Sequence, residues 1–397
     1  MEDPLAPEPA CLPPPPRDGP GRPAAGPRQA GAPAAAALEV HDLVVLRGDF
    51  RLDVPHLVVA AGETLAVLGP NGAGKSTLLE VLALITPPRR GEVRLRGEAA
   101  DSRAARARLR RRLGLALQDP FLLAGSVLDN VALPMRLRGI PRGHARARAR
   151  AWLERFGIAE LAERSSRSVS GGEARRASLA RALVTDPEVL LLDEPFSALD
   201  PPTRDSLQRD FQKALAPGTA VVLVTHDRSE ALALAQQVAV LESGRLLQCG
   251  PAQEVFRRPA DEAVAALVGL DTILSGPVLS CAEGVCRVEV APGVVVEAAA
   301  EAPAGAHLTL CVHPEEVTLE RQPAAAQTTA RNVFPALIRS LTPHGPGRRV
   351  ELECPFPLVA VVTRRSAEEL QLRPGERVLA AFKASAVHVF PARRSAP

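Results

Sequence analysis

The chain has 397 residues, enough for two or three domains, and its 46% apolar content is sufficient for sizeable hydrophobic cores. A net charge of +3, with 3% aromatic residues and no Tyr, argues against a polyanionic partner and against stacking on single-stranded nucleic acid. Because no stretch of 18 residues is continuously apolar and the N-terminus lacks a signal-peptide core, we expect an intracellular protein that meets a membrane only through a partner.

Residues 1–37 consist mainly of Pro, Ala and Gly, and the run Pro13–Pro16 excludes a helix there. Few large apolar side chains are available to order this segment. We predict a disordered tail to which no function can be assigned.

The six cysteines are scattered, at positions 11, 249, 281, 286, 311 and 354. None has the spacing of a zinc site, and the pair Cys281 and Cys286 lacks a His or Cys partner pattern. We therefore expect reduced thiols, most of them small apolar fillers.

After two β-type segments, 38–45 and 50–59, comes the most informative stretch of the chain, a loop that fits the pattern G-x4-G-K-[ST]. An apolar strand is predicted before it and an apolar-faced helix after it. This order surrounds a triphosphate with backbone N–H groups and a helix N-terminus. Lys75 would reach the β- and γ-phosphates, and the Ser76 hydroxyl would hold Mg²⁺. The predicted ATP-binding residues are Gly69, Pro70, Asn71, Gly72, Ala73, Gly74, Lys75, Ser76 and Thr77.

Further apolar strands are predicted at 113–118, 188–195 and 220–227, with helical segments between them, including one at about 121–166. Strands that alternate with helices predict an α/β fold with a mostly parallel sheet. The unusual polar residues all fall at strand C-terminal ends, where open α/β sheets bind ligands. They are Lys75, Gln118, Asp193, Glu194 and His226.

Arginine-rich runs at 101–112 and 142–150 are interpreted as solvated helical faces. The alternative, a nucleic-acid patch, is weakened because the runs lack aromatic and amide side chains for base contacts.

The composition changes near residue 265, where short β-type runs separated by Pro and Gly turns begin. We predict a nucleotide-binding domain at 38–264 and an all-β domain at 265–397. The second domain is expected to be an OB-like barrel pair.

Between residue 38 and about residue 260 the chain resembles an ATP-binding-cassette (ABC) ATPase subunit, which implies a P-loop NTPase core with a helical subdomain. Six motifs occur in the family's order. They are the phosphate loop, the Q-loop residue Gln118, the signature 169–173 (Val-Ser-Gly-Gly-Glu), the Walker B strand 189–195, the D-loop 197–200 and the switch residue His226.

The resemblance implies a role for each motif residue. Asp193 and Gln118 would bind Mg²⁺, Glu194 would polarise the attacking water, and His226 would contact the γ-phosphate. In the family the signature faces the nucleotide of a second subunit, so two ATP are sandwiched in a head-to-tail homodimer. The signature residues here are Ser170, Gly171, Gly172 and Glu173. Gln118 would couple closure of the dimer to a transmembrane permease docked near residues 118–130.

Two positions depart from the family pattern. Arg47 stands where an aromatic residue usually stacks on adenine; a guanidinium can stack on a purine face, with Phe50 as the alternative. Glu173 stands where Gln is commoner, but the backbone donors are unchanged, so we expect activity.

Residues 328–390 resemble the small molybdate-binding β module attached to some importer ATPases. A tetrahedral oxyanion needs N–H and O–H donors together with one or two cations. The resemblance brings donors of these types near the module's oxyanion site: Thr329, Arg331, Lys383 and Ser385. The alternative is that they cap strands and that the module only dimerises the subunit.

The resemblance therefore implies the ATPase subunit of a molybdate or tungstate importer. It would lie peripherally on the cytoplasmic face of the cell membrane, bind the permease, and depend indirectly on a substrate-binding protein. Alternatives are an importer ATPase for sulfate, ferric iron or a polyamine, a soluble non-transport cassette ATPase, and an oxyanion store that does not hydrolyse ATP.

Overall fold

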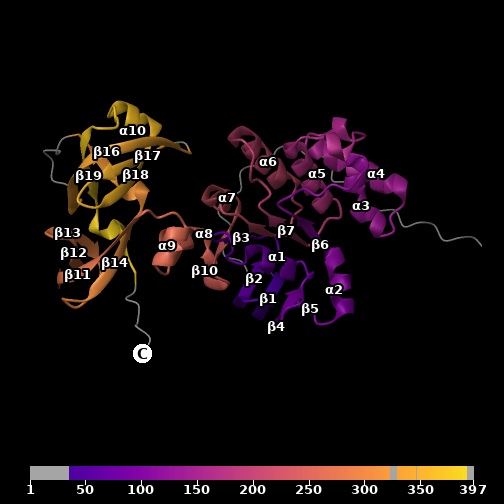
Figure 1. The fold of residues 1–397 in the computed structure, drawn as a ribbon, viewed down its shortest axis with the longest axis horizontal. Helices are drawn as coiled ribbons and strands as arrows, with labels where there is room; N and C mark the ends of the chain where they lie inside the picture. The colour runs from indigo at the N-terminus through magenta and orange to yellow at the C-terminus, as the bar shows by residue number, and fades with distance from the viewer. Residues whose placement is uncertain (1–34, 322–328, 346, 391–397) are drawn as a thin grey trace, which may run out of the picture. The chain divides into compact units, whose positions relative to one another are not determined.

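The computed structural model describes residues 35–321, 329–345 and 347–390, so the predicted tail at 1–37 lies almost wholly outside the described residues (Figure 1). Within them the order of strands and helices changes near residue 270. Strands and helices alternate before that point, and strands dominate after it.

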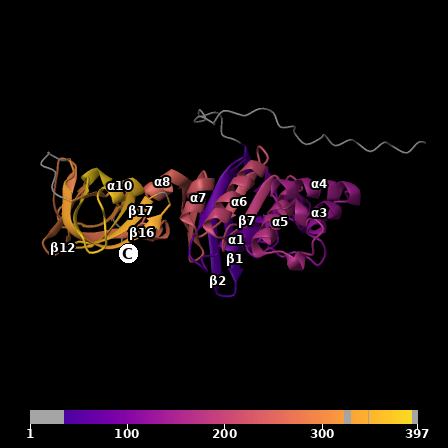
Figure 2. The ribbon, with the colours of Figure 1, turned by 90° about the horizontal axis from the view of Figure 1, so that it is seen from above.

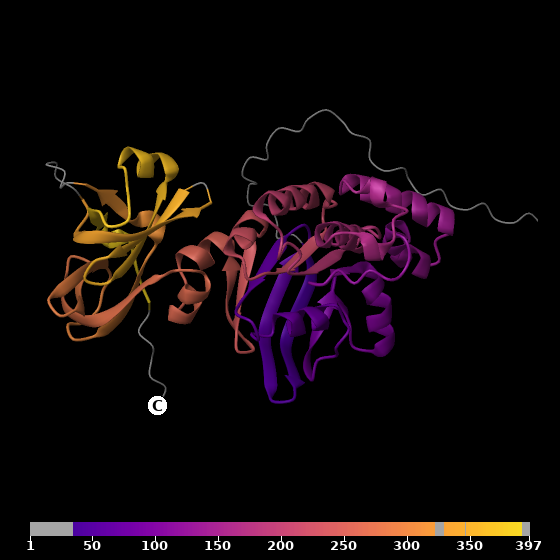
Figure 3. The same cartoon turned by 45° about the horizontal axis from the view of Figure 1, so that its top comes forward.

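The first part of the described chain builds a ten-stranded sheet with the order β5-β4-β1-β2-β10-β9-β3-β8-β7-β6. The strands are β1 (Ala36–Arg47), β2 (Phe50–Ala60), β3 (Thr64–Leu68), β4 (Arg90–Leu95), β5 (Glu98–Ala99), β6 (Leu113–Ala116), β7 (Val189–Asp193), β8 (Ala220–Val224), β9 (Gln237–Glu242) and β10 (Arg245–Pro251). Strands β9, β3, β8, β7 and β6, which form one end of this order, are parallel, and this part of the sheet confirms the predicted α/β fold. Strands β1, β2, β4 and β5 form an antiparallel extension, and Figure 3 shows the long indigo strands β1 and β2 side by side.

Both faces of the parallel strands are covered, as expected for strands that are apolar on both sides. Val189 and Leu191 of β7 pack in one core with α1 and β1, whereas Leu190 and Leu192 pack in another with α3, α4 and α5. The helices are α1 (Lys75–Leu82), α2 (Arg103–Leu109), α3 (Val127–Leu137), α4 (Arg142–Arg155), α5 (Gly171–Leu183), α6 (Pro201–Ala214), α7 (Arg228–Leu234), α8 (Ala252–Arg257) and α9 (Glu262–Leu267), with short 3-10 turns at Arg110–Arg112, Ala159–Leu161 and Ser166–Ser168. Helices α3, α4 and α5 gather together in Figures 1 and 2.

The first arginine-rich run forms α2 and the 3-10 turn Arg110–Arg112, and the second lies in α4. Several of their guanidinium groups pair with carboxylates. Arg112 donates to Glu188 at 2.6 Å, and Arg146 donates to Asp129 at 2.5 Å. This pairing supports the interpretation as solvated helical faces. The helix predicted from residue 121 begins only at Val127, because residues 117–125 run as a loop after β6.

The later strands form two five-stranded antiparallel sheets with matching orders, β13-β12-β11-β14-β20 and β18-β17-β16-β19-β15. The two halves of this β region, 272–320 and 332–389, therefore repeat one plan, and each gives its last strand to the other half's sheet. The elements are β11 (Thr272–Ala282), β12 (Val285–Ala291), β13 (Val294–Ala299), β14 (His307–Val312), η4 (Pro314–Glu316), β15 (Thr318–Glu320), β16 (Asn332–His344), β17 (Gly347–Glu353), β18 (Pro357–Thr363), α10 (Arg364–Glu369), β19 (Arg377–Phe382), η5 (Ala384–Ala386) and β20 (Val387–Val389). The predicted pair of OB-like units agrees with this all-β arrangement, while the boundary at 264/265 stays a prediction.

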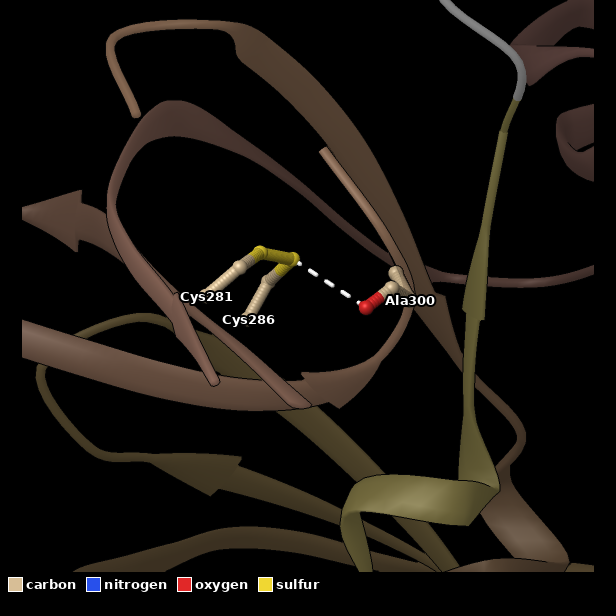
Figure 4. The surroundings of a disulfide bond; sticks show 3 residues. All are labelled: Cys281, Cys286 and Ala300. Atoms are coloured by element: carbon tan, nitrogen blue, oxygen red, sulfur yellow. Dashed lines mark hydrogen bonds between the residues drawn. A yellow bond between two sulfur atoms is a disulfide. The ribbon is translucent and has the colours of Figure 1, made fainter. Parts of the chain in front are cut away.

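Two cysteines form a disulfide between β11 and β12, Cys281 and Cys286 (Figure 4). Our expectation of reduced thiols is wrong for this pair. The turn at Glu283 and Gly284, both with positive φ, places the two residues directly opposite each other in the hairpin. Cys311 fits the predicted role of apolar filler, since it is fully buried and burial raises the pKa of its thiol to about 12.

Candidate functional site

The phosphate loop lies between β3 and α1, as its sequence predicted. Gly74 adopts φ 103° at the start of α1, and a Cβ there would come within 2.7 Å of the Phe50 ring. Glycine is therefore required both by conformation and by close packing. The loop leads directly into the N-terminus of α1, where unpaired backbone N–H groups are available to an anion.

Lys75 is 7% exposed and donates to the carbonyl oxygens of Gly69 at 2.7 Å and Pro70 at 3.0 Å. Burial lowers the pKa of Lys75, while the nearby charges of Glu194 and Asp193 act in the opposite direction. The phosphate loop thus fixes the Lys75 ammonium group through two of its own carbonyl oxygens, close to two carboxylates.

Asp193 is the last residue of β7 and Glu194 follows it; they are 8% and 9% exposed. Burial raises the pKa of Asp193, and its hydrogen bond from Ser76 opposes that rise. Ser76 and Asp193, two of the three predicted Mg²⁺ ligands, therefore lie together, and the third, Gln118, bonds to Glu194. Hydroxyl and carboxylate oxygens are the donor types that Mg²⁺ takes, the remaining positions being filled by water and phosphate.

Glu194 is the centre of a side-chain network at the ends of three strands. Its carboxylate accepts from the Gln118 amide at 3.2 Å, and its other oxygen lies 3.0 Å from His226 Nδ1. Glu194 has φ 44°, a conformation uncommon outside glycine, which is held by the hydrogen bond from its N–H to the Val224 carbonyl at 2.9 Å. A constrained carboxylate with two polar partners can orient a water molecule.

These residues line one cavity of about 890 Å³. The two candidates for adenine contact, Arg47 and Phe50, line it. The other lining residues were all predicted for the ATP site: Asn71, Gly72, Gly74, Lys75, Ser76, Thr77, Gln118, Asp193, Glu194 and His226. The Arg47 guanidinium also hydrogen-bonds Glu80, and lies 3.4 Å from the Thr86 hydroxyl. The sequence analysis missed Glu80, although its position one helical turn after Ser76 was available as a signal. Stacking of Arg47 on adenine stays a prediction.

The signature residues Ser170 to Glu173 do not line this cavity. They begin α5 with a capping box, in which Glu173 N–H donates to the Ser170 hydroxyl at 3.4 Å and Ser170 N–H donates to the Glu173 carboxylate at 2.7 Å. The hydrogen bond from the Ser170 backbone lowers the pKa of Glu173. Glu is compatible with this position, where Gln is commoner, because the side chain of either residue can accept the hydrogen bond from Ser170 N–H.

The four predicted oxyanion residues lie at one end of the β region and are exposed: Thr329, Arg331, Lys383 and Ser385. Asn332 pairs with Phe382 in the β16–β19 ladder, so Arg331 and Lys383 directly flank that pair. Asn332, which the sequence analysis did not single out, is 2% exposed and exchanges two hydrogen bonds with the Glu297 backbone, at 2.7 and 2.9 Å. It ties β16 to β13 beside the candidate anion site.

Among the described residues, no group of three or more His, Cys, Asp or Glu side chains is arranged as a metal cluster. No helix in the described part of the chain is both long and apolar enough to cross a membrane. The fold and the cavity define a P-loop nucleoside-triphosphate hydrolase.

Comparison with known proteins agrees with that class. Residues 52–197 match the family model of the ABC transporter, and residues 328–389 match that of the TOBE domain. The chain is 36% identical over 346 residues to the molybdate/tungstate import ATP-binding protein WtpC of Pyrococcus horikoshii, covering 86% of this chain and 96% of that protein. It is also 36% identical over 360 residues to the molybdenum import ATP-binding protein ModC of Mycobacterium tuberculosis, covering 87% and 95%.

A solved structure gives the same result for the first part of the chain. The cbiO1 protein of Clostridium perfringens, part of the ABC transporter complex cbiONQ, has a TM-score of 0.52 and 30% identity, covering 60% of this chain and 96% of that one. The chain belongs to the ABC transporter family, as an ATP-hydrolysing import subunit that carries a C-terminal TOBE domain.

Proposed function

We propose that this chain is the ATP-hydrolysing subunit that energises import of molybdate or tungstate through a membrane permease. ATP hydrolysis is supported by the buried Glu194 carboxylate, which is hydrogen-bonded to Gln118 and His226. Glu194 lines the same cavity as the phosphate loop. Molybdate or tungstate is favoured as the solute by the share of this chain that the relatives match. WtpC of Pyrococcus horikoshii and ModC of Mycobacterium tuberculosis match 86% and 87% of this chain, whereas the sulfate/thiosulfate import ATP-binding protein CysA 2 of Chromobacterium violaceum matches 74% and the Fe(3+) ions import ATP-binding protein FbpC of Streptomyces avermitilis 57%.

In this mechanism the chain's own residues bind and orient the reactants. The N–H groups of the phosphate loop and the Lys75 ammonium hold the β- and γ-phosphates. Ser76 and Asp193, with Gln118, would hold Mg²⁺, which neutralises charge on the phosphate oxygens. Glu194 accepts a hydrogen bond from the attacking water, and His226, with a side chain 60% exposed, can turn toward the γ-phosphate.

The signature supports a head-to-tail homodimer. Ser170, Gly171 and Gly172 form a second helix N-terminus, yet they lie outside the cavity of their own chain. A second copy could bring these N–H groups to the open side of the cavity and enclose the triphosphate between two chains. Each ATP would then contact both chains.

A permease would dock beside the Q-loop. Leu117, Phe121 and Leu123 are 43%, 67% and 58% exposed in the loop that follows β6, so apolar surface is available next to Gln118. Docking there would hold the subunit peripherally at the cytoplasmic face of the membrane, with a substrate-binding protein acting through the permease.

The β region supports an oxyanion ligand at one of its two ends. In the repeated plan Thr272 corresponds to Asn332, because each is the first residue of its strand. The side chain of each also accepts a hydrogen bond from a backbone N–H of the other half, that of Val359 at 3.1 Å for Thr272 and that of Glu297 at 2.7 Å for Asn332. The positions that correspond to Arg331 and Lys383 are then Asp271 and His313, and η4 carries Glu315 and Glu316. The Asp271 end also carries Arg349, but this arginine is paired with Asp271 at 2.5 Å. We therefore assign the oxyanion to the Arg331 and Lys383 end, where its binding would restrain uptake when cytoplasmic oxyanion is abundant.

Reconstitution tests the proposal. The chain, its permease and the binding protein in liposomes should hydrolyse ATP faster when molybdate or tungstate is supplied outside, and should accumulate that anion inside. Stimulation by sulfate or ferric iron alone would refute the solute and leave the ATPase role intact. Failure to hydrolyse ATP under every condition would refute the enzymatic role.

A further inference from the structure

Helix α5 carries an arginine whose contacts join three separate motifs of the ATP site. Arg175 lies two residues after Glu173, on a stretch whose sequence indicates only an ordinary helix with one apolar face. Its Nη2 donates to the Gln118 carbonyl at 3.1 Å. Its Nη1 donates to the Ser197 hydroxyl at 3.0 Å, to the Ser197 carbonyl, and to the Glu194 carbonyl at 3.4 Å.

Two of the three carbonyl groups that accept from Arg175, those of Glu194 and Ser197, belong to a turn under conformational constraint. Glu194 has φ 44° and Ala198 has φ 56°, so two non-glycine residues of this turn are left-handed. Ser197 adds local bonds, with its N–H and its hydroxyl both donating to the Glu194 carbonyl, at 3.3 and 3.0 Å. A planar guanidinium with five donors can hold several carbonyl groups at once, which a lysine ammonium cannot do in one plane.

The surroundings of this guanidinium act on its pKa in both directions. Burial lowers the pKa of Arg175, and the charges of Asp119, Glu194 and Glu230 act to raise it. One helical turn and a half further along α5, Arg181 donates to the Phe121 carbonyl at 2.5 Å. The helix that begins with the signature therefore holds the Q-loop segment at both Gln118 and Phe121.

We propose that Arg175 is a positioning residue for ATP hydrolysis, which sets the orientation of Glu194 by tying its turn to Gln118 and to the signature helix. It acts through backbone carbonyl groups and does not line the nucleotide cavity. Movement of the Q-loop is thereby transmitted to Glu194 as well as to α5. The proposal rests on the assigned role of Glu194 in hydrolysis.

Steady-state kinetics of the full-length chain test this role. Arg175→Ala should lower kcat by about 10- to 100-fold, since hydrogen bonds from a charged donor to the Glu194 turn are lost. KM for ATP should stay within about twofold, because the phosphate loop is untouched. Arg175→Lys should recover part of kcat. Millimolar guanidinium should restore kcat of Arg175→Ala and have no such effect on the wild type.

Arg176→Ala is the matched control from the same helix. Arg176 donates to Asp210 at 2.9 Å and to the Phe156 carbonyl at 3.0 Å, so its loss should lower the melting temperature and leave kcat unchanged. An unchanged kcat in Arg175→Ala, or a raised KM as the sole effect, would overturn the proposal. If Arg175→Ala does not fold, the same criteria apply to Arg175→Gln. Absence of hydrolysis in the wild type would instead count against the role of Glu194.

Discussion

The ATP cavity and the proposed oxyanion site at Arg331 and Lys383 differ in how their cationic side chains are held. Lys75 is buried and donates to two carbonyl groups within its own loop, whereas Arg331 and Lys383 are exposed side chains. Burial gives the first site a defined geometry before any ligand arrives. The exposed site must obtain its geometry from the ligand or from a second surface, so its affinity depends more on individual charges.

The largest effect should come from the buried site. Glu194→Gln keeps the size of the side chain and removes the negative charge that polarises water, so kcat should fall by at least about 100-fold. ATP should still bind, and dimers should accumulate in ATP and Mg²⁺. Phosphate release and size-exclusion chromatography measure the two outcomes. Turnover equal to that of the wild type would remove Glu194 from catalysis and favour an oxyanion store.

The affinity of the exposed Arg331 and Lys383 end for molybdate should fall when one positive charge is removed. Lys383→Ala should weaken molybdate binding by about 10- to 100-fold, the loss expected for one charge-assisted hydrogen bond. His313→Ala, at the corresponding position of the other half, is the control and should bind as the wild type does. Isothermal titration of the full chain with molybdate, tungstate and sulfate makes the comparison. Equal affinities in the two variants would refute the assignment, and no heat in the wild type would favour a purely structural module.

Substitution of the buried carboxylate Asp193 should change stability and activity in opposite directions. Because burial raises its pKa, the folded state binds a proton more readily than the unfolded state, and this residue's cost to stability increases as pH rises through the folded pKa. Asp193→Asn should therefore raise the melting temperature of the nucleotide-free protein at neutral pH, by about 2–4 °C if ~1 kcal/mol is recovered. The gain should shrink at acidic pH, while Mg²⁺-dependent hydrolysis is lost at every pH. Calorimetry at several pH values decides, and a lower melting temperature at neutral pH would contradict the argument.

The smallest effect is expected at the signature. Glu173→Gln preserves the capping box, since the amide oxygen can accept from Ser170 N–H, so kcat should stay within about twofold. Glu173→Ala removes that bond and should cost about 1 kcal/mol of stability. Thermal melts and phosphate release compare the two variants. A much larger loss of activity in Glu173→Gln would mean that the carboxylate acts beyond the cap.

The two halves of the β region add a second lesson. They share strand order, register and even the hydrogen bond that closes each end, yet Asp271 and His313 stand where Arg331 and Lys383 stand in the other half. A repeated fold therefore does not carry the same charges at corresponding positions.

The amino-acid sequence by itself determined the α/β class, the phosphate loop and the strand-end positions of Gln118, Asp193, Glu194 and His226. These features depend on short contiguous patterns, and parallel strands bring their C-terminal ends to one edge whatever the details of packing. Only the tertiary structure decided the partners of Arg175 and Arg47, the pairing of Cys281 with Cys286, and the exchange of last strands between the two β halves. Each of these depends on which strands become neighbours and which way a side chain turns, and local propensity along the chain contains neither.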